Sequence, residues 1–215
     1  PFEPGTFGTL VAIPIAHGLH RVTGDLGFVL AIVLLFAAGV WASAVTSRNL
    51  GVSDHGAIVV DEVAAFLLVL FFTGTDPFRE AVAFLLFRFF DIVKPPPARG
   101  IDRNWHGGFG VMADDIVAAG YALVAFALIV LAVAARTMAL TVQNRVIRLE
   151  EQLRMQRLLP ADLQGRIGEL SVAQLVALRF ASDAELPELT RTVLTQGITD
   201  KKAIKRMVTT WRPDH

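Results

Sequence analysis

The sequence predicts an all-α protein, a polytopic membrane helical bundle followed by a small soluble helical tail. Three observations predict this fold class. Hydrophobic residues make up 53% of the chain and charged residues only 19%, below the share of about 25% that is usual for soluble domains. Two uncharged runs are long enough to cross a bilayer. The charge also changes sign along the chain: residues 1–135 hold 7 basic and 11 acidic side chains, residues 136–215 hold 13 and 9. We therefore expect two domains, 1–135 and 136–215.

The two uncharged runs are residues 26–45 and 116–135, twenty residues each. At about 1.5 Å per residue, each makes roughly 30 Å of helix, the thickness of a bilayer's hydrocarbon core. Residues 4–20 are also uncharged but contain two prolines, which indicates a short or broken span, with Gly5–Thr9 as a turn that opens a helix and Thr9 as its cap. The chain begins at Pro1 without Met or signal peptide, and we expect a truncated N-terminus.

Residues 63–75 and 81–87 are apolar but too short to cross a bilayer unaided. A helical hairpin buried among the other helices and partly re-entrant suits them better than two full spans. The alternative is that both cross, with Asp61, Glu62 and Arg88 held inside the bundle. Pro95–Pro97 ends the helix before it.

The tail after Arg136 is soluble in character. Val142, Val146, Leu149 and Leu153 form a narrow apolar seam on an amphipathic helix, and this seam could join two copies as a homo-oligomer. Further helices are predicted at three places: after Ser171 up to residue 180, from residue 184 to 196 with Asp183 as cap and Gly197 as stop, and from Thr199 or Asp200 through residue 208. The mixed charges favour a solvated surface over lipid binding, and we expect no nucleic-acid partner.

The acidic residues of the first part gather in three short stretches, 54–62, 88–97 and 102–115, which hold seven of the 11. Carboxylates beside membrane helices cost a few kcal/mol each unless they are paired, hydrated or metal-bound. Hard oxygen ligands without any cysteine point to Mg²⁺ rather than zinc. The basic side chains between them suit an oxyanion such as phosphate. For Asp114 and Asp115, favourable interaction with a helix dipole is a competing structural explanation for one of the two.

Four motifs in order carry a family resemblance: P-G-T-F-G-T-L, D-H-G-A-I-V-V-D-E, F-R-F-F-D-I-V-K-P and D-R-N-W-H-G-G-F-G-V-M-A-D-D-I-V-A. Over about residues 4–135 the chain resembles phosphatidylglycerophosphatase A. The resemblance implies Mg²⁺-dependent hydrolysis of the terminal phosphomonoester of phosphatidylglycerophosphate, giving phosphatidylglycerol at the bacterial inner membrane. The tail and the span before it resemble an uncharacterised bacterial membrane-protein family, which implies no activity.

The resemblance also implies the site residues. Asp61, Glu62, Asp91, Asp114 and Asp115 are the expected metal ligands, and four of these together with His106 are the expected catalytic groups: Asp61, Glu62, Asp91 and Asp115. Arg88, Lys94 and Arg103 are expected to bind the substrate, and Asp102 lies with His106 in the glycine-rich loop. No Ser, Cys or His stands out as a covalent nucleophile, so we expect direct attack by a metal-activated water.

The Lys and Arg residues of the predicted loops indicate how the chain is oriented in the membrane. If 63–90 is a hairpin, residues 47–62 and 91–114 share one side, and their Lys and Arg residues place the active site at the cytoplasmic face. The last span would then carry a basic tail to the other side, which the positive-inside rule disfavours for short segments but not for long domains.

Two other functions remain open from the sequence. One is a divalent-cation or proton transporter, which requires carboxylates spread along the depth of the spans, whereas these gather at segment ends. The other is a membrane-tethered adaptor that acts through its tail, for which the first part would be inactive.

Overall fold

The computed structural model describes residues 4–50, 59–105 and 107–213, without the side chains of residues 47–50, 102 and 103. Within these ranges the fold is all-helical, as the sequence predicts. The helices in chain order are α1 (Pro4–Val22), α2 (Asp25–Leu50), α3 (Val60–Thr73), α4 (Pro77–Val93), α5 (Ala98–Asn104), α6 (Gly108–Leu158), α7 (Ala161–Gln164), η1 (Ile167–Glu169), α8 (Val172–Leu178), α9 (Leu186–Gln196) and α10 (Lys201–Met207). The chain divides into two compact units, Pro1–Leu131 (unit 1) and Ala132–His215 (unit 2).

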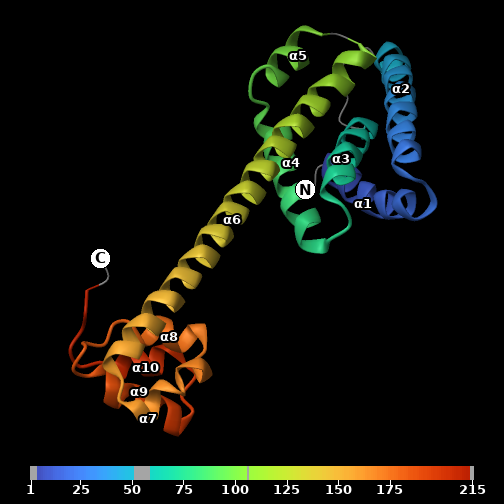
Figure 1. Ribbon diagram of the computed structural model, residues 1–215. Helices are drawn as coiled ribbons and strands as arrows, with labels where there is room; N and C mark the ends of the chain where they lie inside the picture. The colour runs from blue at the N-terminus through green and yellow to red at the C-terminus, as the bar shows by residue number, and fades with distance from the viewer. Residues whose placement is uncertain (1–3, 51–58, 106, 214–215) are drawn as a thin grey trace. The chain divides into compact units, whose positions relative to one another are not determined.

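Helix α3 is the centre of unit 1, packed against α1, α2 and α4 (Figure 1). Its apolar side chains, among them Phe66, Leu67 and Leu70, are buried in the core of the unit. Helices α3 and α4 form the hairpin expected from the sequence: Gly74 ends α3 with a positive φ of 75°, and the Asp76 side chain caps α4. The hairpin brings the first turn of α3 and the last turn of α4 to the same end of unit 1.

Helix α1 corrects the prediction for the N-terminal segment. It is one helix from Pro4 to Val22, with Pro14 inside it, and not a broken span. Residues 5–9 lie within its first two turns, so they are not a turn ahead of the helix. Thr9 is not a cap, because its Oγ1 donates to the carbonyl of Gly5 at 2.8 Å inside the helix.

Glycines of the 107–110 stretch let the start of α6 pack directly on α2. A Cβ at Gly108 would lie 2.0 Å from the carbonyl oxygen of Val40, and one at Gly39 would lie 2.6 Å from Met112. Backbone approach this close is possible only without side chains. The contact fixes the first turns of α6, which carry Asp114 and Asp115.

Two helical segments are long and apolar enough to cross a membrane, Asp25–Thr46 and Gly108–Leu158. In their most apolar windows only 22% and 17% of the residues are buried within the protein. A core helix of a water-soluble protein would be mostly covered by its neighbours, so these exposed apolar surfaces favour a lipid environment.

The predicted apolar seam lies on an exposed face of α6 after Arg136, so its role in joining two copies stays a prediction. Helix α6 runs without a break through Arg136. The four seam residues are all exposed: Val142, Val146, Leu149 and Leu153. The buried positions are instead Ile147, Glu151 and Met155. Unit 2 thus uses another stripe of the same helix for its core.

The short helices of unit 2 begin close to the predicted caps, with one exception. Ser171 and Gln174 form a reciprocal capping box at α8, Asp200 caps α10, and Gly197 ends α9 in the left-handed region. Asp183 is not the cap of α9, because that helix begins at Leu186 with Pro187 in its first turn. The Asp183 carboxylate instead accepts from Arg154 at 2.6 Å.

Candidate active site

Three carboxylates converge at the end of unit 1 where α3 begins. Asp61 and Glu62 lie in the first turn of α3, and Asp115 lies in the second turn of α6. One ligand oxygen from each lies within 4.8 Å of the other two. Asp61 and Asp115 are buried, with 7% and 3% of their surface exposed. Residues far apart in the sequence thus form one compact group of hard oxygen ligands.

Two more acidic side chains lie next to this group. Asp91 at the end of α4 and Asp114 on α6 are both buried and both lie within electrostatic range of Asp115. Asp91 also shares a hydrogen bond with Asp115. Ionised carboxylates this close together in low-dielectric surroundings repel each other, so the arrangement requires protons or cations to compensate the charge.

Two basic side chains supply part of that compensation. Arg88 Nη1 donates to Asp91 Oδ2 at 2.5 Å between buried side chains one helical turn apart on α4. Lys94, which ends α4 with a φ of 43°, donates from Nζ to Asp114 Oδ2 at 2.5 Å. The Lys94 side chain is 26% exposed, so part of it is accessible from outside.

Gly5 on α1 completes the wall of the site, and it was not among the predicted site residues. A Cβ at this position would lie 1.9 Å from Glu62 Oε1 and 3.2 Å from Arg88 Nη1. The sequence signal that could have indicated it is the spacing of Gly5 and Gly8, since small residues four or fewer apart on one helix face mark close helix approach. Gly8 indeed lies against Val59, whose Cγ1 would be 2.0 Å from a Cβ there.

The chemistry of this group fits a divalent cation bound through oxygen. Among the described residues, Glu62 Oε2 is buried without a hydrogen-bond partner, and an orphaned buried carboxylate oxygen needs a positive ligand. Carboxylate ligands without nitrogen or sulfur match Mg²⁺ or Ca²⁺ rather than zinc. The three converging carboxylates, Asp61, Glu62 and Asp115, are therefore the residues that could hold such an ion.

Several predicted residues lie outside the part of the chain that the structure describes. His106 is one of them, and the side chains of Asp102 and Arg103 are two others. The Asp54–His55 stretch is also outside it. Their roles as proton donor or substrate ligands stay predictions.

A second polar pair lies inside unit 1, away from the carboxylate group. Glu80 in the first turn of α4 is buried and bonds to His17 of α1. Glu80 and Asp91 are eleven residues apart on one helix, which is roughly 16 Å at 1.5 Å per residue. The pair ties α1 to α4 at the far end of the hairpin from the carboxylate group.

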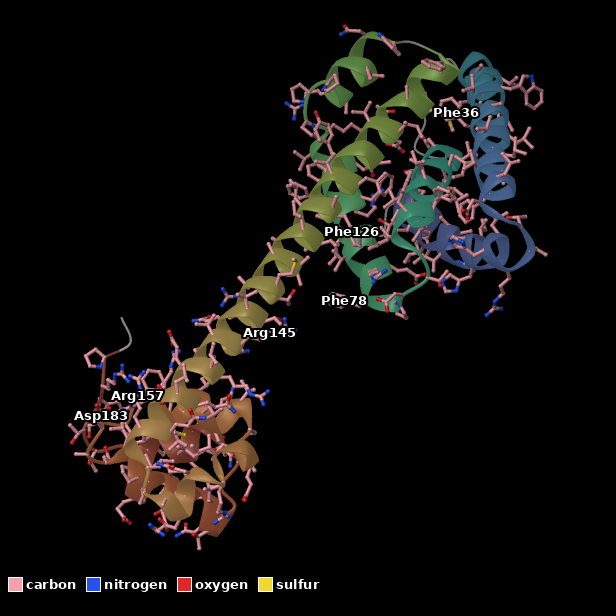
Figure 2. The ribbon with its side chains drawn as sticks, viewed as in Figure 1. Phe36, Phe78, Phe126, Arg145, Arg157 and Asp183 are labelled. Atoms are coloured by element: carbon pink, nitrogen blue, oxygen red, sulfur yellow. The ribbon has the colours of Figure 1, made fainter. Side chains whose placement is uncertain are left out.

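Unit 2 has its own groove, with a volume of about 900 Å³, between the end of α6 and the segment 179–183. Arg157 and Asp183 both line it (Figure 2). Both acidic and basic side chains line it, and Arg154 donates to both Glu151 and Asp183. The Arg154–Asp183 pair connects α6 to the loop before α9. The charged side chains of the groove therefore have a structural role.

Comparison with known proteins follows the same division of the chain. The family described as phosphatidylglycerophosphatase A matches residues 1–130, and a family of unknown function, DUF6526, matches residues 110–215. Phosphatidylglycerophosphatase A of Escherichia coli K12 is 40% identical over 119 residues, covering 55% of this chain and 69% of the relative. The Haemophilus influenzae protein of that name is 39% identical over 122 residues, covering 56% and 75%.

A third relative has a different name. A Bacteroides thetaiotaomicron protein whose name provisionally assigns it as a phosphatidylinositol-3-phosphatase is 40% identical over 134 residues, covering 59% of this chain and 83% of the relative. No solved structure matches the chain. The carboxylate group, its two basic partners and Gly5 all lie within the residues matched by the first family.

Proposed function

The chain belongs to the phosphatidylglycerophosphatase A family, and we propose from this that it hydrolyses phosphatidylglycerophosphate with the help of Mg²⁺. Water would cleave the P–O bond of the terminal phosphomonoester, leaving phosphatidylglycerol and inorganic phosphate. Its relatives are phosphatases of phospholipids, and the chain is a hydrolase of the same kind. The observation that carries the proposal is the convergence of Asp61, Glu62 and Asp115 beside Arg88 and Lys94.

Mg²⁺ would be held by Asp61, Glu62 and Asp115. Their ligand oxygens are close enough to share one ion, and Glu62 Oε2 has no other partner among the described residues. When bound, the ion would polarise a phosphoryl oxygen or lower the pKa of a bound water. Asp91 and Asp114 were also expected as ligands; because both form ion pairs in the structure, we assign them to the basic side chains instead.

Arg88 and Lys94 would bind the phosphate. Both are basic side chains next to the carboxylate group, and charge-assisted hydrogen bonds to phosphate oxygens are the strong ones. Asp91 and Asp114 hold these two cations in place. A substrate phosphate would therefore meet donors that are already oriented, which lowers the cost of ordering them on binding. Arg103 of α5 and His106, two residues after that helix in the sequence, would complete the site.

The reaction would take place at the inner membrane of a bacterium. The exposed apolar surfaces of α2 and α6 support a chain that crosses the bilayer more than once. Four basic residues favour a cytoplasmic active site, since the segments on the cytoplasmic side of membrane proteins carry an excess of Lys and Arg. They are Arg48 near the end of α2, Lys94 after α4, and Arg99 and Arg103 of α5. In that position the site would contact the lipid headgroup while the acyl chains stay in the bilayer. The proposed hydrolysis would be a step of phospholipid biosynthesis.

The gathered position of the acidic residues supports a phosphatase over a transporter. Transport requires ionisable groups along the depth of the membrane, whereas Asp61, Glu62, Asp91, Asp114 and Asp115 lie at one end of the α3–α4 hairpin and at the start of α6. Among the buried acidic side chains in the described part of unit 1, Glu80 is the exception, and it bonds to His17.

The experiment is phosphate release from phosphatidylglycerophosphate by the purified protein in detergent. We expect Asp61→Asn and Asp115→Asn to lose at least about a hundredfold in kcat, since each removes a ligand charge. Asp76→Asn is the matched control, because it makes the same change at an exposed cap where Asn serves equally well.

Metal dependence is tested separately from turnover. Chelation should abolish phosphate release and added Mg²⁺ should restore it. Calorimetric titration of the chelated protein with Mg²⁺ should show binding to the wild type and to Asp76→Asn but not to Asp61→Asn. Full activity after chelation, or in either ligand variant, would contradict the proposal.

A further inference from the structure

An apolar groove of about 540 Å³ runs along the contact between α1 and α3. Its lining residues are Pro4, Phe7, Gly8 and Val11 of α1, together with Val59 and Val63 at the start of α3. All six are apolar or without a side chain. On α1 the residues recur every three or four positions, so they form one stripe along the helix.

On both helices, residues of the groove are neighbours of residues that form the carboxylate site. Val59 and Val63 precede and follow Asp61 and Glu62 within one turn of α3. On α1, Gly5 lies between Pro4 and Gly8 of the groove and abuts the Glu62 carboxylate and Arg88. The same two helical turns therefore carry a charged site and an apolar channel next to it.

We propose that this groove holds an acyl chain of the phospholipid whose phosphate binds at the carboxylate group; this inference rests on the function proposed above. An anion-binding site joined to an uncharged groove is complementary to an amphiphile. A water-soluble phosphomonoester would fill only the first of the two. The groove makes α1 the element that distinguishes a lipid phosphate from a free one.

The groove's contribution in a membrane is orientation. Lipid tails already lie in an apolar medium, so a chain that moves from the bilayer into the groove gains little hydrophobic free energy. A chain seated along α1 would instead fix the direction from which the headgroup enters, and a reacting group held in place gains rate through orientation. For a substrate dissolved in water, by contrast, the apolar contact itself contributes to the free energy of binding, and this contribution can be measured.

The test uses short-chain analogues of phosphatidylglycerophosphate that stay monomeric, with butyryl or hexanoyl chains. For the full-length protein we expect kcat/KM to rise with chain length, by up to about fourfold for each methylene that enters the groove, the equivalent of about 0.8 kcal/mol. Val11→Trp places an indole over the groove and should reduce this chain-length ratio towards one, with KM rising more than kcat falls.

The matched control is Leu30→Trp on α2. Leu30 is 51% exposed and Val11 is 52% exposed, but Leu30 does not line the groove. Both variants add an indole to an exposed position of an apolar helix, and partition of the substrate into detergent affects both alike. Leu30→Trp should keep the wild-type ratio.

A second measurement uses only the wild-type protein, so misfolding of a variant cannot affect its result. Lipids with a photoreactive diazirine at mid-chain are cross-linked to the wild-type protein, and the labelled peptides are identified by mass spectrometry. We expect a phosphomonoester headgroup to enrich labels on residues 4–11 and 59–63 at least about threefold over a phosphocholine headgroup. Labels of equal strength on residues 4–11 and 59–63 with both lipids would overturn the inference.

The outcomes separate the two proposals. Phosphate release from every analogue without any effect of chain length, and with equal ratios in the wild type and Val11→Trp, would overturn the acyl-chain groove and leave the phosphatase intact. No phosphate release from any analogue would overturn the proposed function, and this inference with it.

Discussion

Gly5 of α1 lies directly against the carboxylate of Glu62 on α3. A Cβ at position 5 would come within 1.9 Å of Glu62 Oε1, far inside van der Waals contact. The neighbouring Arg88 Nη1 would be at 3.2 Å. The absence of a side chain on α1 thus defines where a proposed metal ligand and a proposed phosphate ligand can lie.

Gly5→Ala should impair activity without unfolding the protein. The clash falls on the end of a flexible Glu side chain, so the Glu62 carboxylate can move away, but it then leaves its place beside Asp61 and Asp115. Displacement of a reacting group by about 1 Å can cost on the order of a hundredfold, and we expect a loss of roughly tenfold to a hundredfold in kcat. The Mg²⁺ concentration for half-maximal activity should rise in parallel.

Gly18→Ala is the control for this change. Gly18 lies on the same helix, and nothing lies within 4 Å of a Cβ built there. Ala in a helix is favoured over Gly by about 0.5–1 kcal/mol, so this variant should unfold at a slightly higher temperature with unchanged kinetics. Equal kinetics for Gly5→Ala and Gly18→Ala would show that activity does not depend on the position of the Glu62 carboxylate.

Lys94 is predicted to bind both the Asp114 carboxylate and the substrate phosphate. Lys94→Gln removes a charge-assisted hydrogen bond, worth about 1.5–3 kcal/mol, so KM should rise roughly tenfold or more. The single variant should also be less stable, because it leaves the Asp114 carboxylate buried without its cation.

The double variant Lys94→Gln/Asp114→Asn separates these two effects. It removes both charges, so the melting temperature should return towards the wild-type value while KM stays high. Recovery of KM in the double variant would mean that Lys94 acts only on Asp114 and does not contact phosphate.

The elements of unit 1 could be predicted from the sequence, but the site geometry could not. Runs of uncharged residues predict α2 and the apolar part of α6, but α2 continues to Leu50 and α6 runs from Gly108 to Leu158, beyond the length that bilayer thickness requires. The meeting of Asp61 with Asp115 does not follow from any spacing, because it depends on how α3 and α6 pack. The family resemblance named both residues, and the structure adds that Asp91 and Asp114 pair with cations.

In the tail, the sequence did not reveal which face of α6 the other helices cover. The exposed seam from Val142 to Leu153 is entirely apolar, whereas the buried stripe includes Glu151, so periodicity alone could not indicate the buried face. The face with Ile147 and Met155 is buried because the core of unit 2 forms there. At Asp183, a capping residue was available, but Arg154 binds its carboxylate and Pro187 shifts the start of α9.

Glu185 should make the end of the tail sensitive to acid. Its carboxylate accepts from Thr209 N at 2.8 Å, Thr209 Oγ1 at 2.8 Å and Thr210 N at 3.2 Å. The bond from the Thr209 backbone, with smaller contributions from the Thr209 hydroxyl and Thr210, lowers the pKa of Glu185 below its ordinary 4.5. Because the unfolded chain binds this proton more readily, the stabilisation is present above that value and is lost as the pH falls through the lowered pKa.

Hydrogen exchange of the full-length protein, corrected for intrinsic rates, checks this. Protection of the amides of Thr209 and Thr210 should decrease below about pH 4.5 in the wild type. Glu185→Gln should show weaker protection that no longer depends on this titration, and Glu188→Gln, at an exposed position of the same helix, should behave like the wild type. An identical pH response in Glu185→Gln would exclude this carboxylate as the cause.

Phosphatase activity should not require a folded tail, and a buried charge in unit 2 tests this. Leu178 is fully buried in the unit 2 core, so Leu178→Asp should unfold that unit, as a buried unpaired carboxylate costs several kcal/mol. The proposed active-site residues with described side chains all lie in unit 1, and phosphate release in detergent should stay within about twofold of the wild type. Gln156→Asp, which adds the same charge at an exposed position of α6, should leave the tail folded. Loss of phosphate release only in Leu178→Asp would instead favour a protein that acts through its tail.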